Sequence, residues 1–511
     1  MTVESPPLAA DPTNPTPGFW LTVDLLRSTT SPGVAGLRAL IISPKQTGVG
    51  DIVANTEVRP VCSADDVKTA AGRCLGFLAM VALLANDTGG PLVDLVCPTE
   101  SGGAAATATI TFAAAPTSNQ VFEVAIQGVE IQLPWNYGDA NTVARDLAVA
   151  AINLKADELF CVASAGAGGV VNLTANSKGP AGNDIALRCR IISGAGGTLT
   201  ASGALFTGGT TEPDFTTALA TVEGREYDFI IGCVSNADAQ SASTSNPSRI
   251  EDHIDALKSG RTAKLQQAHL ASTGTIAQAA TGSIARNSEY MTHLVTENAE
   301  SLPSEFAGAD CGDRMKRRRL EKNANRCFTL LKGLHGAHDK IANNPTDAEG
   351  RTALTSGVSL CGYTANDELV LLRSVTTHSQ DSSGSPDRRC FDTNEVDAIF
   401  ELGKDLRTYL PQQYLTSGSQ VKVVADTPEG QEPPPKGVVE CRDIKATITK
   451  RIRDYWVPQG VIDRAAFLAS IEPGEFIVQV NATDETQVDI FIPAKAVKIL
   501  AKLGVYLAKT G

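Results

Sequence analysis

The stretch Leu92-Val93-Asp94-Leu95-Val96-Cys97 is a mostly apolar run, as expected of a strand inside a parallel sheet. A second strand-like run, Leu37 to Ile42, precedes it. Between the two, Ser63 is followed by two acids, which is typical of a capped helix start. The helix is expected to reach Ala85, with a break at Gly72. This order of strand, helix and strand predicts an α/β core.

The composition changes after Glu100, where charged residues become rare and Ala, Gly, Thr and Ser dominate. Alternating runs such as Thr107 to Phe112 and Val121 to Ile126 predict antiparallel strands, with one helix from Asn141 to Leu154. Because α/β segments flank this block on both sides, we interpret it as an inserted domain. We expect it to lie on the outer face and to be dispensable for the core fold.

The α/β pattern returns with Tyr227 to Cys233, a buried strand ending near a glycine, and with the strand Leu369 to Thr377. A polar linker, Ser379 to Asp387, precedes a last block of helices and strands. The predicted organisation is an N-terminal linker arm (1–32), an α/β core (33–100 and 213–385), an inserted β-rich domain (101–212), an α+β C-terminal domain (386–485) and a C-terminal strand arm (486–511).

Bulk composition excludes several classes of protein. The 44 Lys and Arg against 57 Asp and Glu give a net charge of −13, which disfavours a general nucleic-acid binder. The longest apolar run, Leu75 to Ala85, is shorter than the roughly 20 residues of a membrane span. The start of the chain, Met1 to Trp20, has no Lys or Arg, so we expect neither a signal nor a transit peptide. The 11 cysteines include no C-x-x-C pair, which favours reduced thiols in a cytoplasmic folding compartment.

Sequence motifs for catalysis, cofactors and metals are weak. Gly357-Val358-Ser359-Leu360-Cys361 resembles a nucleophile elbow, but Cys replaces the second Gly and the strand–turn–helix context is missing. His335 and His338 have no third metal ligand near them in the sequence. The glycine-rich turns at 166–169 and 194–197 match no phosphate-binding loop. We therefore predict that the chain is not an enzyme and has no catalytic, cofactor or metal site.

The strongest charge run extends from Arg314 to Arg326. On a helix it would form either a solvated face or a contact with an acidic surface, such as a neighbouring copy of this acidic chain. Nucleic acid is a third and weaker option, because no aromatic residues are interleaved. The candidate charged contacts between subunits are Arg317, Arg318, Arg319, Lys495, Lys498 and Lys502.

Both ends of the chain contain isolated strand material. The N-terminal segment is Phe19-Trp20-Leu21-Thr22-Val23, which follows a proline-rich leader. The C-terminal candidates are Val488, Ile490, Ile492, Ile499, Leu500, Leu503 and Val505. Such extended termini can add strands to sheets of other subunits, so we expect them to act as assembly arms.

Several short segments, in order along nearly the whole chain, resemble the tail sheath proteins of contractile-tailed bacteriophages, particularly the sheath of phage Mu and its relatives. They are Pro17-Gly18-Phe19-Trp20-Leu21-Thr22-Val23-Asp24, Tyr227-Asp228-Phe229-Ile230, Arg286-Asn287, Arg373-Ser374-Val375-Thr376-Thr377, Gln487-Val488-Asp489-Ile490-Phe491-Ile492-Pro493 and Val497 to Leu507. Gln487 and Lys498 depart from the Arg and Asn of the family pattern, and 101–212 is the least similar part.

This resemblance implies a three-layer, subtilisin-like sheath core without a catalytic triad. It also implies hexameric rings stacked around a tail tube, tied by the terminal arms, which contract to drive the tube through the host envelope. The implied partners are other copies of the chain, the tube protein, and baseplate and terminator proteins, with no direct nucleic-acid contact and no membrane insertion. The implied location is the virion, after assembly in the bacterial cytoplasm.

Three alternatives remain open at this stage. A type VI-like or other injection-system sheath would share the mechanism in another setting. A subtilisin-like hydrolase would need a Ser, a His and an Asp brought together by the fold. A passive shell protein would form assemblies with only one lattice.

Overall fold

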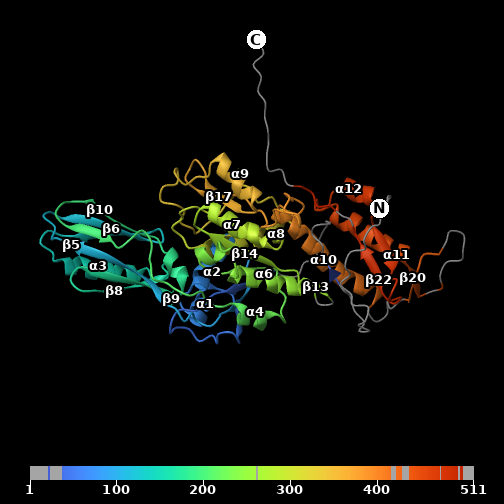
Figure 1. The fold of residues 1–511 in the computed structure, drawn as a ribbon, viewed down its shortest axis with the longest axis horizontal. Coiled ribbons are helices and arrows are strands. Elements are labelled where there is room, and N and C mark those ends of the chain that lie inside the picture. The colour runs from blue at the N-terminus through green and yellow to red at the C-terminus, as the bar shows by residue number, and fades with distance from the viewer. Residues whose placement is uncertain are drawn as a thin grey trace, which may run out of the picture.

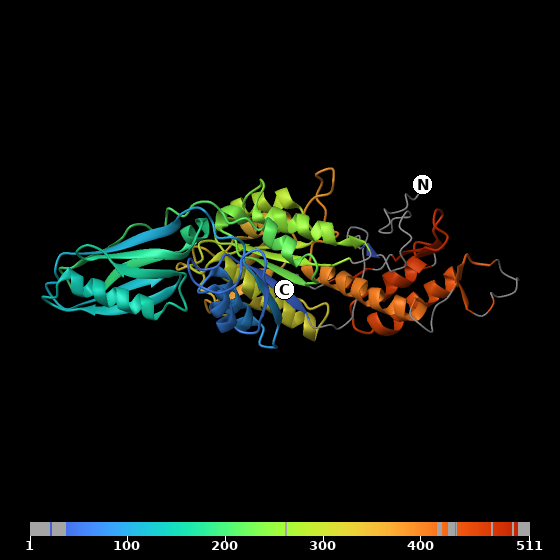
Figure 2. The same cartoon turned by 90° about the horizontal axis from the view of Figure 1, so that it is seen from below.

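The computed structural model describes residues 37–260, 263–415, 422–427, 435, 437–471, 474–492 and 495–498, together with the backbone of 21–22. Figure 1 shows three bodies in a row, with a β-rich body at one end, a central body around a large sheet, and a smaller body at the other end. Figure 2 shows the same row from below. In the part of the chain that is described, no helix combines the length and the apolar character needed to cross a bilayer.

The central body is built on a nine-stranded sheet of order β16-β18-β17-β15-β14-β12-β2-β4-β3. The six strands from β17 to β4 are parallel, and the flanking strands β18, β16 and β3 are antiparallel to their neighbours. The strands are β2 (Arg38–Ile42), β3 (Val58–Val61), β4 (Leu92–Val96), β12 (Phe229–Gly232), β14 (Gln267–Ser272), β15 (Met291–Val295), β16 (Thr329–Leu330), β17 (Ser359–Tyr363) and β18 (Leu369–Arg373). The mixed α/β character predicted from the apolar runs is therefore present.

Helices cover both faces of this sheet. Alternate strand residues divide between two apolar clusters, with Ile41 packing on one face and Leu40 on the other. The first face carries α1 (Ala64–Ala71), α2 (Leu75–Asn86) and α8 (Pro303–Leu320). The second carries α4 (Thr216–Val222), α6 (Asn246–Leu257), α7 (Ile276–Arg286) and α9 (Asp347–Thr355). The expected helix break is present, because Gly72 has φ +75° and separates α1 from α2.

The β-rich body contains two antiparallel sheets, of order β10-β6-β7 and β11-β5-β9-β8, and one helix. Its elements are β5 (Ala105–Ala113), β6 (Gln120–Ile126), β7 (Val129–Trp135), α3 (Asn141–Leu154), β8 (Cys161–Ala165), β9 (Val170–Lys178), the 3₁₀ turn η1 (Pro180–Asp184), β10 (Leu187–Ser193) and β11 (Thr198–Ala201). Alternate residues of β5 are buried, which is the pattern of a strand with one face on a core. We call this body, with the two chain segments that lead into and out of it, the insert.

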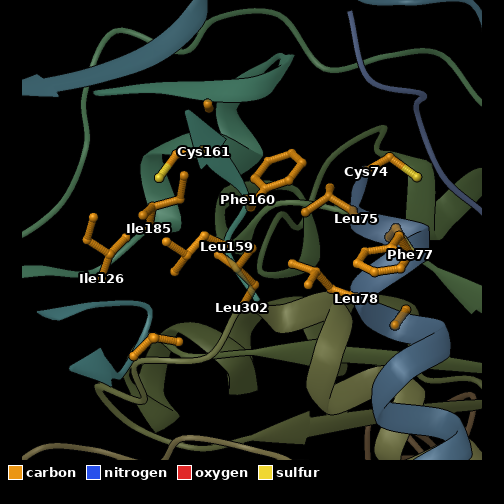
Figure 3. Close-up of a cluster of buried hydrophobic side chains, with 14 of the residues drawn as sticks. Cys74, Leu75, Phe77, Leu78, Ile126, Leu159, Phe160, Cys161, Ile185 and Leu302 are labelled. Carbon is orange, nitrogen blue, oxygen red and sulfur yellow. The ribbon is translucent and has the colours of Figure 1, made fainter. Parts of the chain in front are cut away.

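A continuous apolar seam joins the insert to the central body (Figure 3). Leu159 and Phe160 of the insert lie beside Leu75, Leu78 and Leu302 of the central body, and all five are buried. Deleting the insert would therefore expose apolar side chains of α2. This bears directly on the expectation that the core folds without the insert.

The third body begins on the long helix α10 (Thr393–Tyr414), which extends from the central sheet into it (Figure 2). Its other elements are β19 (Lys422–Val424), β20 (Val438–Glu440), α11 (Cys441–Arg451), the π-helical turn η2 (Ile452–Trp456), α12 (Arg464–Ile471), β21 (Ile477–Val480) and β22 (Val488–Phe491). Trp456, Phe467 and Phe476 are buried at its centre. This small α+β unit has its own apolar core. Helix α10 contributes side chains both to this core and to the core of the central body.

Candidate functional site

The predicted N-terminal arm is described only at β1 (Leu21–Thr22). This strand pairs antiparallel with β13 (Ser259–Gly260) of the same chain, at the end of α6. Phe19, Trp20 and Val23 lie outside the described residues. Within the described part of the chain, β1 and β13 form a sheet of two strands, so each keeps one edge unpaired.

The predicted C-terminal arm begins with β22, which pairs antiparallel with β21. Val488 lies opposite Val480, and Ile490 lies opposite Val478. Val488, Ile490 and Ile492 are half-buried against the apolar core of the third body. Ile499, Leu500, Leu503, Val505 and Lys502 lie outside the described residues. The first half of the arm is thus a strand of its own domain, and this sheet too has two strands in the part that is described.

After β22 the chain contacts the third body at Val461 and the central body at Asn323. The backbone N–H of Val497 donates to Val461, and Asn323 donates through its side chain to the Val497 carbonyl oxygen at 2.9 Å. Lys498 forms an ion pair with Glu395 at the start of α10. Lys495 is exposed. Lys498 therefore contacts its own chain, and Lys495 presents its charge at the surface.

The basic run on α8 was interpreted as a solvated face or as a contact with an acidic surface, but Arg314 and Arg318 are buried inside the chain. Arg314 donates to both carboxylate oxygens of Asp397, at 2.9 and 3.0 Å. Arg318 is 2% exposed and contacts Glu401, with Asp397 at 3.3 Å. The expectation that Arg318 forms a contact between subunits is therefore wrong, because its guanidinium is enclosed among carboxylates of its own chain.

The neighbouring bases are also paired within the chain but keep some exposure. Arg317 donates to Asp313 at 2.9 Å, and its side chain is 37% exposed. Arg319 pairs with the buried Asp87, and 27% of its side chain is exposed. Of the three arginines, Arg317 and Arg319 retain surface that another molecule could contact.

The ion pairs continue along α10 beyond Arg318. Lys404 pairs with Asp228, which immediately precedes β12, and Arg407 donates to both oxygens of Glu226 at 2.6 and 2.7 Å. Together with Asp397 and Glu401, these residues hold successive turns of α10 against the central body. We call these residues, together with Arg314 and Arg318 of α8, the α8–α10 charge network.

The surroundings of Asp397 and Arg318 favour their ionised forms. Burial alone would raise the pKa of Asp397, but Arg314 and Arg318 beside it outweigh burial and hold the pKa below its usual range. Burial likewise disfavours the Arg318 cation, yet Glu401 and Asp397 raise the pKa of this guanidinium. Removing one partner from such a buried pair would leave an uncompensated charge in the interior, which is strongly destabilising.

The spacing of charged residues in the sequence contains a signal for this network. Asp397, Glu401 and Asp405 recur every four residues, as do Arg314 and Arg318. Two helices with opposite charges at the same spacing can form a ladder of ion pairs across their contact. In the structure Asp397 and Glu401 contact α8, whereas Asp405 pairs with Arg451 of α11.

The candidate nucleophile Ser359 is buried on β17, where its hydroxyl accepts from the Val375 N–H at 2.8 Å and donates to the Val375 carbonyl oxygen at 3.0 Å. A serine–histidine contact does occur elsewhere, since His293 bonds Ser283 at 2.9 Å and Ser272 at 3.0 Å. All three are buried, and burial, with Arg286 adding, holds the pKa of His293 far below its usual range. His335 and His338 are exposed, and no metal-ligand cluster occurs among the described residues.

No protein-family model and no curated protein matches the sequence. Among solved structures, a sheath tail protein of Desulfitobacterium hafniense is similar over 92% of this chain and 99% of its own, at 11% identity and a TM-score of 0.45. A sheath tail protein of Listeria innocua is similar over 93% of this chain and 97% of its own, at 12% identity and a TM-score of 0.42. The helical sheath of the anti-feeding prophage in its contracted state is similar over 98% of this chain and 99% of its own, at 11% identity and a TM-score of 0.44. These three similar structures are thus tail sheath proteins of two bacteria and the sheath of a prophage.

Proposed function

We propose that this chain is the structural subunit of a contractile tail sheath. In this role, hexameric rings stack helically around an inner tail tube and contract to drive the tube through the host envelope for genome delivery. The ordered sequence motifs, from Pro17–Asp24 to Val497–Leu507, support the proposal. The structural observation that carries it is that the two terminal strands, β1 and β22, each belong to a two-stranded sheet with unpaired edges in the described chain.

The mechanism follows from what such edges can do. An unpaired strand edge presents N–H and C=O groups that a strand from another subunit can satisfy. A contact of this kind joins different surfaces of two copies, and when its rotation does not close, it generates a helix. Stored energy for contraction requires two packings of one sequence separated by a barrier. The arms would keep the lattice joined while the central bodies reorient.

The remaining assignments are part of the same proposal. The central body would be the family's subtilisin-like core without a triad. The insert, 101–212, would lie on the outer face, and the domain 386–485 would lie nearest the tube. The partners would be other copies, the tube, the baseplate and the terminator, in a virion assembled in the host cytoplasm. Lys495, Lys502, Arg317 and Arg319 would contribute charged contacts between subunits, at most about 1 kcal/mol each if exposed.

Negative-stain microscopy of purified assemblies tests this proposal. The full chain should form tubes in a long and a short lattice, whereas a passive shell would show one lattice. Removing 1–24, or 499–511 so that β22 stays in place, should leave soluble rings or monomers but no long tubes. Lys502→Gln is the matched control and should only make the tubes more salt-sensitive. Tubes of normal length from both truncations would refute the arm mechanism, and a single lattice would refute the sheath function.

A further inference from the structure

The described part of the chain ends beside the central body. The carbonyl oxygen of Val497 accepts from the Asn323 side chain at 2.9 Å, and Lys498 pairs with Glu395 of α10. Asn323 lies between α8 and β16, and β16 is an edge strand of the nine-stranded sheet. The segment 499–511, which lies outside the described residues, therefore begins at a defined point on the central body.

An open groove of about 330 Å³ lies beside β16. Its lining combines two lysines and two acids with apolar side chains, which include Leu330, Leu334, Tyr363 and Leu369. Leu330 is exposed, and Leu320, at the end of α8 and three residues before Asn323, is 78% exposed. Because the charges in the lining balance, apolar side chains decide what the groove can hold.

The backbone of β16 limits how an occupant can bind. The Leu331 N–H donates to the Leu369 carbonyl oxygen at 3.1 Å, so Leu331 faces β18 and the N–H and C=O of Leu330 face the free edge. At the next such position, Asn86 accepts from the Lys332 N–H at 2.9 Å and donates to the Lys332 carbonyl oxygen at 3.0 Å. A strand added at Leu330 therefore cannot continue past Lys332, and an occupant must bind mainly through side chains in the groove.

The segment 499–511 is long enough to reach this groove. Asn323 and Leu330 are seven residues apart, so their Cα atoms are at most about 25 Å apart. The thirteen residues of the segment extend to about 45 Å. The segment can thus pass from Asn323 to Leu330 and still have residues left to lie in the groove.

The sequence of the segment suits an apolar surface. Every second residue from 499 to 507 is apolar, namely Ile499, Ala501, Leu503, Val505 and Leu507. The alternate positions include Lys502 and Gly504. Because successive side chains of an extended chain point to opposite faces, the segment would have one entirely apolar face and one mixed face.

We propose that the segment 499–511 docks on the central body of its own chain, with its apolar face over Leu320, Leu330 and the groove beside β16. The chain's own segment is favoured over that of another copy, because a short tether holds it at an effective concentration of roughly millimolar. The docking does not depend on the proposed function. Because the proposed function uses the same segment between subunits, docking would also delay tube formation, and this consequence rests on the proposed function.

Hydrogen exchange of the unassembled full chain, corrected for intrinsic rates, tests the docking. Burying one leucine side chain shifts an equilibrium by roughly tenfold or more, so the Leu330 N–H should exchange at least about tenfold faster in a chain that ends at Lys498. A synthetic 499–511 peptide at millimolar concentration should restore the protection of the shortened chain. In the full chain the protection should stay the same when the protein is diluted, as expected of a contact within one molecule.

Two pairs of variants sharpen the test. Leu503→Asp, on the apolar face of the segment, should abolish the protection, while Lys502→Gln, on the other face, should keep it. Leu320→Ser should lower the protection, and the matched control Leu154→Ser, which changes an exposed leucine of the insert, should not. Equal exchange at 328–331 in the full and the shortened chain would overturn the proposal. Protection that rises with protein concentration would also overturn it, because the segment would then dock on another copy.

Discussion

Replacing Arg318 by methionine tests whether the α8–α10 charge network holds α10 on the central body. Methionine keeps an unbranched apolar stem of similar length but removes the charge and all five N–H donors. Arg318 is 2% exposed, so water cannot replace the lost donors without opening the contact between the helices. We expect Arg318→Met to lower the free energy of unfolding.

The size of the effect follows from what each carboxylate keeps. Asp397 retains Arg314, and Asp228 retains Lys404. Among the described residues, Glu401 keeps only Lys322, at 3.6 Å. One buried carboxylate thus loses its close partner, and breaking one buried pair costs about 3–5 kcal/mol. The Arg318 guanidinium also lies 5.3 Å from the Phe229 ring centroid. Losing this cation–π contact should add about 0.5–1 kcal/mol to the destabilisation.

Urea unfolding followed by circular dichroism at 222 nm would measure this change. The matched control is Arg453→Met, because Arg453 pairs with Asp454 at 2.7 Å but its side chain is 55% exposed, and its loss should cost about 0–1 kcal/mol. Adding Glu401→Gln to Arg318→Met should recover at least half of the loss, since it removes the stranded anion. A loss for Arg318→Met within 1 kcal/mol of the control would refute our reasoning, and so would a double variant that recovers nothing.

Two further predictions concern buried groups. Phe160→Ala, at the seam, should lower the free energy of unfolding by about 3–5 kcal/mol. Phe328 is 69% exposed, so the control Phe328→Ala should change it by less than about 0.5 kcal/mol. Equal losses for the two variants in urea titrations would contradict a packed seam. Ser359→Ala should cost about 1–3 kcal/mol, because it leaves the Val375 N–H unpaired. A fluorophosphonate probe should label neither this variant nor the unsubstituted chain, and labelling that depends on Ser359 would show that it acts as a nucleophile.

The sequence predicted the elements whose pattern is local. The apolar runs at Leu37–Ile42 and Leu92–Cys97 became neighbouring parallel strands, and the helix from Asn141 to Leu154 has the expected bounds. These succeed because burial on both faces of a strand, or on one face of a helix, is recorded in adjacent residues. The order of the nine strands could not be predicted in this way, because it depends on contacts between segments far apart in the chain.

The candidate site was harder to predict for the same reason. The basic run around Arg318 looks like a surface when only its own helix is considered, and its carboxylate partners Asp397 and Glu401 lie 79 and 83 residues further along the chain. Ser359 begins β17, and its hydroxyl bonds the backbone of Val375.

Helix α10 packs into two bodies at once, and this limits where segments of the chain can be exchanged with those of a relative. Ile399 and Phe400 pack into the central body, while Ala398 and Leu402, on the same turns, pack into the third body. A chimera joined anywhere within those turns would combine half of one interface with half of another. Viable junctions therefore lie before the helix, in the polar segment 379–387, or after it. A transplanted third body that begins at the earlier junction must bring carboxylates in register with the recipient's arginines.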